Sequence, residues 1–218
     1  MKRFTSLAAL TALLITAAAC GDDDSSSTAD TNAAASTSAA SEATEPADVP
    51  QAIISLAPTQ TEILFAIGAG DQVIAVDEMS NYPAEALDKP HDLSGFEPNV
   101  EAIAALNPDL VVIGDDFKGL APQLAELGID SWASPAPTTL DEAYAQIEQL
   151  GAVTGHIAEA AELVGNMQTD IQAAVDAAPP STRSTPVTYY HELDPTLYTV
   201  TSNSFVGQVY ALFGLMSI

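Results

Sequence analysis

Short apolar runs and helical patterns alternate along the first half of the folded chain. Four runs are predicted as strands: residues 52–57, 72–76, 109–114 and 129–133. Segments with apolar residues at helical spacing lie between them, each two or three turns long. Strands separated by such helices indicate βαβ units, and therefore a parallel sheet. The pattern predicts an α/β lobe over residues 51–140.

The stretch "IISLAPTQTEILFAIGAG", residues 53–70, passes from the first strand to the first helix through a polar turn. Thr59 and Glu62 have the spacing of a capping box, and Gly68 is expected to end the helix. Ligands of parallel sheets bind beyond the carboxyl ends of the strands, where helices begin. Pro58 and Thr59 are therefore predicted to border a cleft, toward which free backbone N–H groups point.

After Leu140 the strand pattern disappears. Two helices are predicted over residues 141–178, and the second begins at His156 and runs to Ala178 with apolar residues at helical spacing. Its length would be about 30–35 Å at 1.5 Å per residue, which is too long for a local crossover.

A second α/β lobe is predicted to begin in residues 184–218. A strand starts at Val187, the stretch "DPTLYTVTSNSF" follows, and a helix begins at Ser204 or Phe205. Two strands and one helix cannot enclose a core of ordinary size. We therefore expect this lobe to be incomplete, with its C-terminal part missing.

The N-terminus has the pattern of an export signal. Residues 1–19 combine Lys2 and Arg3 with a short apolar segment, which indicates a signal peptide and not a membrane span. Cys20 is the only cysteine, so no internal disulfide is possible. Its position after "TAAA" resembles a lipoprotein signal, in which this cysteine carries the lipid. The alternative is an ordinary signal peptide with an unrelated cysteine.

Residues 20–50 contain no aromatic residue and almost no large apolar one. Such a segment cannot bury enough surface to offset its ordering entropy. It is predicted to be a flexible, lipid-anchored tether.

The charge balance excludes several partners. The chain has 30 acidic and five basic residues, a net charge of −25. Loss of Lys2 and Arg3 with the signal would leave a net charge of −27. A field of this sign argues against nucleic acid and anionic lipid as partners. A solvated acidic surface explains the charge better than a dedicated cation site.

Catalytic and metal-binding signatures are missing from the sequence. It has no GxSxG, P-loop, GxGxxG or HExxH motif, so no enzyme is predicted. His91 and His191, with Glu192 or Asp194, could in principle form a metal site. Their spacing has no ligand signature, and no metal site or cofactor is predicted. His156, at the start of the long helix, is expected to be exposed.

Several strings, in order, resemble one family. "IISLAPTQTEILFAIGAGDQVIAVDEMSNYP", "PNVEAIAALNPDLVVIG" and "LAELGI" look like the substrate-binding proteins of ABC importers for vitamin B12, ferric siderophores and haem. The resemblance runs from about residue 51 to the end. It implies two α/β lobes with parallel sheets, joined by one long backbone helix at about residues 156–178. It also implies a ligand in the cleft between the lobes and a location outside the cytoplasm.

The resemblance assigns roles to individual positions. It implies ligand contacts from loops of both lobes: Pro58, Thr59, Tyr82, Gly95, Phe96, Asp115, His191 and Glu192. Gly95 and Phe96 stand where some relatives carry a tryptophan, and Gly114 and Asp115 where others carry an aromatic. These departures weigh against a corrinoid. Glu101 matches the glutamate with which relatives dock onto their permease. From the residues alone, Tyr82 beside Pro83 could instead pack against the core.

The function implied is capture of a metal chelate and delivery to a membrane permease, without catalysis. The expected ligand is a siderophore, haem or corrinoid. The other expected partners are an ABC permease and a membrane, to which the lipid anchor attaches the protein. The protein is expected to be a monomer. Two alternatives remain open: a surface-anchored lobe with an adhesion or signalling role, and an α/β enzyme that lacks the motifs above.

Overall fold

The computed structural model describes residues 49–116, 118–179 and 185–218. The predicted signal peptide, Cys20 and nearly all of the predicted tether lie outside these residues. None of the helices in the described part of the chain combines the length and apolar character needed to cross a lipid bilayer.

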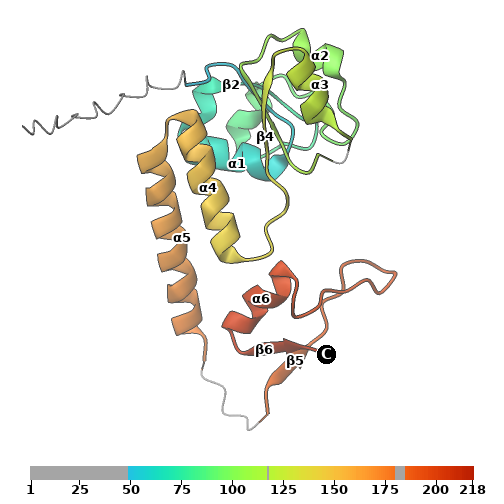
Figure 1. Cartoon of the computed structure of the whole chain (residues 1–218). Coiled ribbons are helices and arrows are strands. Elements are labelled where there is room, and N and C mark those ends of the chain that lie inside the picture. The colour runs from blue at the N-terminus through green and yellow to red at the C-terminus, as the bar shows by residue number, and fades with distance from the viewer. Residues whose placement is uncertain (1–48, 117, 180–184) are drawn as a thin grey trace, which may run out of the picture. The chain divides into compact units, whose positions relative to one another are not determined.

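A four-stranded parallel sheet forms the centre of the first lobe (Figure 1). Its strands are β1 (Ile53–Ser55), β2 (Val73–Val76), β3 (Leu110–Ile113) and β4 (Asp130–Ala133). Their order is β2-β1-β3-β4, and each neighbouring pair is parallel. The predicted parallel sheet is confirmed, and each observed strand falls within or next to one of the four apolar runs.

Helices cover both faces of this sheet. They are α1 (Pro58–Ala66), η1 (Ala69–Gln72), η2 (Ala84–Asp88), α2 (Val100–Ala104), α3 (Leu120–Glu126), α4 (Leu140–Thr154) and α5 (Ile157–Ala177). Successive strand residues point to opposite faces. Ile53 packs with α1, α4 and α5, whereas Ile54 packs with α2 and α3. The continuous apolar runs are therefore explained by burial on both sides.

Helices α4 and α5 pack closely side by side (Figure 1). The turn between them contains Gly155, whose φ of +79° favours glycine. Gly151 permits the close approach, because a Cβ there would collide with Ala160. The continuous helix predicted from His156 is confirmed as α5. His156 is half-buried, with Nδ1 2.9 Å from the Thr154 carbonyl oxygen, so its predicted exposure was wrong.

The predicted start of α1 was also wrong. Ala57 is the N-cap and Pro58 the first helical residue, so Thr59 and Glu62 form no capping box. Proline is well suited to this position because its φ is already helical and it has no N–H to leave unpaired. Thr61, one turn in, bonds back to the Ala57 carbonyl at 3.1 Å.

Residues 185–218 form a small unit of their own. It contains β5 (Val187–Tyr189), α6 (Phe205–Leu212) and β6 (Leu215–Ser217), and the two strands are parallel. Ser204 caps α6 by accepting from the Gly207 N–H at 3.1 Å. The stretch between β5 and α6 contains an isolated antiparallel bridge between Glu192 and Thr199. Asp194 accepts from the Thr196 N–H at 2.7 Å and Leu197 has a φ of +65°, which produces a turn.

Candidate functional site

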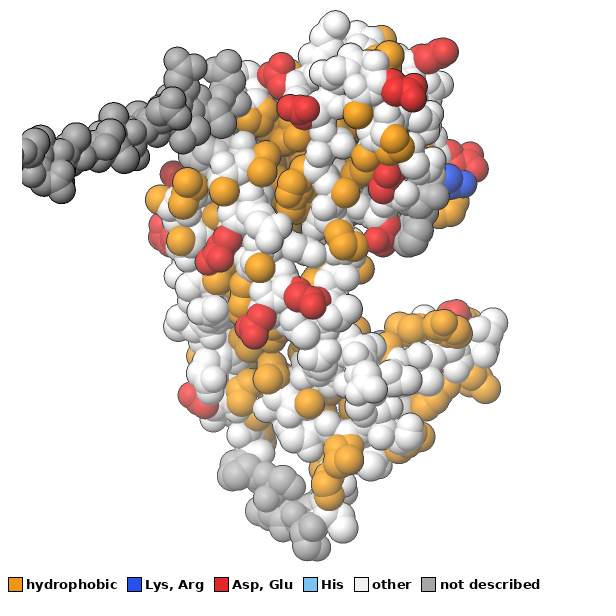
Figure 2. All heavy atoms as spheres, viewed as in Figure 1, with side chains coloured by type: hydrophobic (Ala, Val, Ile, Leu, Met, Phe, Trp, Pro, Cys, Tyr) orange, Lys and Arg blue, Asp and Glu red, His pale blue; other side chains and the backbone are white. Residues whose placement is uncertain are grey.

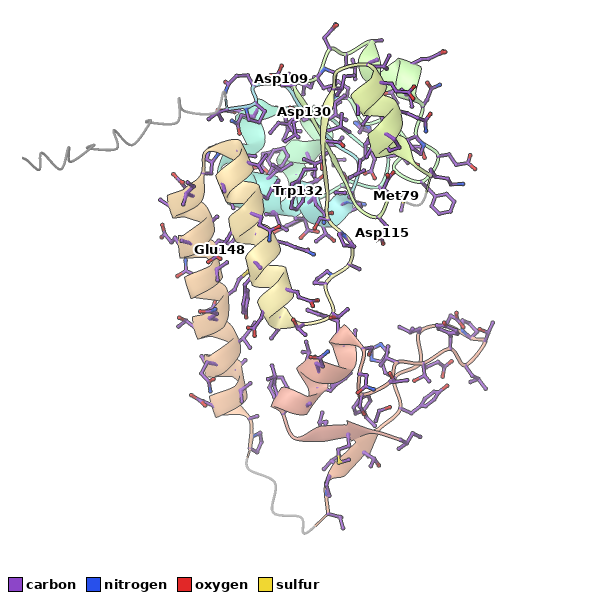
Figure 3. The ribbon with its side chains drawn as sticks, viewed as in Figure 1. Met79, Asp109, Asp115, Asp130, Trp132 and Glu148 are labelled. Carbon is purple, nitrogen blue, oxygen red and sulfur yellow. The ribbon has the colours of Figure 1, made fainter. Side chains whose placement is uncertain are left out.

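The loops that follow the strands gather at one edge of the four-stranded sheet. Figure 3 shows Met79 and Asp115, which follow β2 and β3, at the edge opposite Asp109, which precedes β3, and Asp130, the first residue of β4. We call the edge with Met79 and Asp115 the carboxyl edge. In parallel sheets this is the edge where ligands bind.

One pocket at the carboxyl edge brings together three of the predicted ligand residues. Gly95, Phe96 and Asp115 border a hollow of about 220 Å³, together with Asp116 and Lys118. We call it the loop pocket. The Phe96 side chain is 79% exposed, and the Lys118 ammonium lies 5.6 Å from the centre of its ring. An exposed aromatic ring in a pocket provides a flat apolar surface for a ligand.

A second pocket unites two further predicted residues. Thr59 and Tyr82 border a hollow of about 320 Å³ whose remaining walls come largely from apolar residues of α1, α4 and α5. We call it the helix groove. The Tyr82 side chain is 64% exposed, so it does not pack into the core as the alternative interpretation allowed. Pro58 is exposed at the start of α1 and borders neither pocket.

A chain of buried hydroxyl groups fixes the elements behind these pockets. Thr61 Oγ1 lies 2.8 Å from Ser55 Oγ and 2.9 Å from Ser80 Oγ. The three residues belong to α1, to β1 and to the loop after β2. All three side chains are buried, so their hydrogen bonds are shielded from water and hold Tyr82's loop against α1.

Asp77 is a buried carboxylate directly behind the loop pocket. Its side chain is 3% exposed, and its backbone N–H donates to the Ser55 carbonyl at 3.0 Å. A Cβ added to Gly95 would collide with Asp77 Oδ2, so this carboxylate touches the loop that carries Phe96. Burial raises the pKa of Asp77, and hydrogen bonds from Ser80 oppose the rise only in part.

Replacing Asp77 with asparagine should change how stability depends on pH. A carboxyl group with a raised pKa in the folded state stabilises that state when protonated, below the ordinary value of 3.8, and loses this contribution as pH rises through the folded pKa. The wild type should therefore lose stability relative to Asp77→Asn as pH rises above the ordinary value of 3.8. Urea unfolding at several pH values measures the difference in unfolding free energy between the wild type and the variant. Glu142→Gln is the comparison of opposite sign: hydrogen bonds from Thr138 lower the pKa of Glu142, so the wild type should gain stability relative to this variant as pH rises. If the wild type instead gained stability relative to Asp77→Asn with rising pH, the raised pKa of Asp77 would be contradicted.

The remaining predicted residues lie apart from these two pockets. Glu101 is exposed in the first turn of α2, whose N-cap Asn99 accepts from the Ala102 N–H at 3.0 Å. His191 and Glu192 follow β5 in the C-terminal unit. His191 Nδ1 lies 2.9 Å from the Tyr210 hydroxyl, and Glu192 is exposed.

Sequence reasoning missed Asp77 and Lys118. Asp77 directly follows the apolar run of β2, and a carboxylate in that position is itself a signal for the carboxyl edge. Lys118 is one of only five basic residues in the chain, which makes its place beside the predicted Asp115 notable.

In residues 49–116, 118–179 and 185–218, no group of three or more metal-ligating side chains is arranged to hold an ion.

Comparison with known proteins supports the fold. A family model described as periplasmic binding protein matches residues 53–218. The crystal structure of the periplasmic vitamin B12-binding protein BtuF of Vibrio cholerae aligns with a TM-score of 0.62 at 28% identity, covering 77% of this chain and 66% of that one. The predicted α/β fold class is thereby confirmed.

One sequence relative carries a name that indicates transport, and another carries a name that indicates cobalamin binding. The ABC transporter substrate-binding lipoprotein YvrC of Bacillus subtilis is 29% identical over 166 residues, which cover 73% of this chain and 52% of YvrC. A cobalamin-binding protein of Halobacterium salinarum is 30% identical over 162 residues, covering 72% of this chain and 43% of the relative. The chain thus spans about half the length of the curated relatives it matches.

Proposed function

Because the chain belongs to the periplasmic binding protein family, we propose that it is the solute-binding component of an ABC importer and captures a metal chelate outside the cytoplasm. The chelate classes are ferric siderophores, haem and cobalamins. The names of the relatives support transport, since they include an ABC transporter substrate-binding lipoprotein and a cobalamin-binding protein.

The observation that carries the proposal is the pair of exposed aromatic rings at the carboxyl edge. Tyr82 and Phe96 are 64% and 79% exposed to solvent, and both lie in the long connection between β2 and α2. Aromatic rings of this size dominate binding energetics when a ligand covers them. The organic shell of a chelate or macrocycle has the apolar area to do so.

Polar groups would orient the ligand between these rings. Thr59 lies in the first turn of α1 beside Tyr82, and Asp115 lies beside Phe96. The N–H groups of the first turn of α1 have no partner within the helix and can donate to a ligand oxygen. His191 and Glu192 would supply the opposite wall from the second lobe, and α5 would join the lobes with little hinge motion.

Two further roles complete the transport proposal. Glu101, exposed on α2, would pair with a basic residue of the permease. Cys20 would carry a lipid that holds the protein at the outer face of the membrane, with residues 21–50 as the tether. Both roles rest on the family pattern.

Isothermal titration of the purified chain tests the proposal. Cyanocobalamin, haemin and a ferric trihydroxamate are titrated separately. At least one should bind measurably, with a dissociation constant of about 100 μM or tighter, because the first lobe supplies one aromatic wall of the cleft. Absence of binding to all three would contradict the proposed function.

Replacing Tyr82 with alanine should weaken binding of that chelate about tenfold, because the ligand loses an aromatic contact of about 1.4 kcal/mol. Stability should change by less than about 0.5 kcal/mol, since the side chain is exposed. Leu127→Ala is the control, because Leu127 is a similarly exposed apolar residue at the end of α3. Equal affinities for Tyr82→Ala and the wild type would remove Tyr82 from the site.

A further inference from the structure

We infer that the site selects against anionic ligands and takes a metal chelate that is neutral or positively charged. The inference rests on the proposed function and narrows its ligand. It is carried by the charges that border the pockets of the carboxyl edge.

Carboxylates outnumber cations around these pockets. Asp115 and Asp116 border the loop pocket, and Glu62 borders the helix groove. A third hollow, on the other side of Tyr82, adds Glu85 and shares Glu62. Among the described residues that line these hollows, Lys118 is the single basic side chain. Four carboxylates against one ammonium leave the lining with a net charge of −3.

Further acidic residues lie close to the loop pocket without lining it. Glu78 Oε1 accepts from Ser94 Oγ at 2.9 Å, and Ser94 Oγ also accepts from the Glu97 N–H at 3.0 Å. These contacts place two more acidic residues at the loop that carries Gly95 and Phe96. Figure 2 shows acidic side chains spread over the face in view, whereas basic ones occupy one small spot.

The positive charge of Lys118 does not change the sign of the net charge around the pockets. Its ammonium lies 5.6 Å from the centre of the Phe96 ring, in the same pocket as Asp115 and Asp116. Asp116 Oδ1 accepts from the Leu120 N–H, which holds one carboxylate in place at the start of α3. The loop pocket taken alone therefore keeps a net charge of −1.

The physical consequence follows from Coulomb's law. A ligand that carries several negative charges meets like charges at close range and loses part of its hydration on entering the pockets. Both its association rate and its affinity fall. The exposed rings of Phe96 and Tyr82 favour a ligand with a broad apolar face. The ligand class is thus a large chelate with apolar surface and no net negative charge.

Two matched pairs of chelates test the selection by isothermal titration. Cyanocobalamin, which is neutral, is compared with haemin, which carries two carboxylates. A cationic ferric trihydroxamate is compared with a ferric tris-catecholate, a trianion. In about 0.15 M NaCl we expect the anionic member of the pair that binds to be at least tenfold weaker. The difference in affinity between the two members of the pair should decrease in about 1 M NaCl, where screening is stronger.

Charge removal at the site provides the second measurement. Glu62→Gln/Glu85→Gln should reduce the ratio of the two dissociation constants by about threefold or more. The matched control is Glu126→Gln/Glu159→Gln, which removes the same charge at exposed positions at the end of α3 and in the first turn of α5. In this control variant, the ratio of the two dissociation constants should equal that of the wild type.

The outcomes separate the inference from the function on which it rests. An anionic chelate that binds as tightly as its neutral or cationic counterpart, or more tightly, overturns the selection and leaves the transport proposal standing. A ratio that falls equally in both double variants also overturns it, because the effect would then be one of overall charge. No binding of any chelate removes the proposed function and the inference with it.

Discussion

Replacing Gly151 with alanine is expected to lower the free energy of unfolding by about 1–3 kcal/mol. The added Cβ would collide with the Ala160 side chain and lie 2.9 Å from the His156 carbonyl oxygen. Neither neighbour can turn away, because one is a methyl group fixed to the helix and the other is backbone. Helices α4 and α5 would have to separate where α5 begins.

Gly165→Ala is the matched control. Gly165 also lies within a helix, and a Cβ there would meet nothing within 4 Å. This substitution should stabilise the protein by about 0.5–1 kcal/mol, because alanine favours the helix over the unfolded chain. Urea unfolding followed by circular dichroism measures both. If both variants change stability in the same direction by the same amount, the close packing of α4 on α5 is wrong.

Replacing Gly95 with alanine is expected to weaken chelate binding by about 10- to 100-fold, which corresponds to about 1.4–2.8 kcal/mol. A Cβ at Gly95 would collide with the Leu56 carbonyl oxygen and with Asp77 Oδ2. Both belong to the buried ends of the sheet, so the loop has to move. Phe96 moves with it, and the loop pocket loses its aromatic wall.

Gly114→Ala separates this displacement from the simple addition of a methyl group. Gly114 borders the same pocket, but a Cβ there would make an ordinary contact of 3.7 Å with Ala57. Its loss of affinity should be clearly smaller than that of Gly95→Ala. Titration of both variants, with melting temperatures to verify folding, makes the comparison. A larger loss for Gly114→Ala would contradict the assigned role of Gly95.

The strands and the long helix could be predicted because their patterns are dictated by burial. Residues 110–113 are apolar throughout, since β3 is covered on both faces. The helix from His156 is long enough for its spacing to be unambiguous. Short elements were less predictable. Strand β6 has three residues and pairs with β5, which lies before α6 in the sequence.

The site could be predicted only one loop at a time. Asp115 directly follows the strand pattern of residues 109–114, but Tyr82, Phe96 and Asp115 were all predicted as ligand contacts through the family resemblance. That Gly95 and Asp115 share one pocket depends on β1 lying between β2 and β3, and no local pattern specifies this order. Asp77 was missed for a related reason, because its burial depends on Gly95 from a loop 18 positions later.

Mapping of amide chemical shifts tests whether the carboxyl edge is the binding surface. The ¹⁵N-labelled chain is titrated with diamagnetic ligands, cyanocobalamin and a gallium trihydroxamate. We expect the shifted amides to cluster in the segments that carry Thr59, Tyr82, Gly95, Phe96, Gly114 and Asp115, which border the pockets. Shifts at Asp109 and Asp130, on the opposite edge, or no shifts with either ligand, would contradict the account.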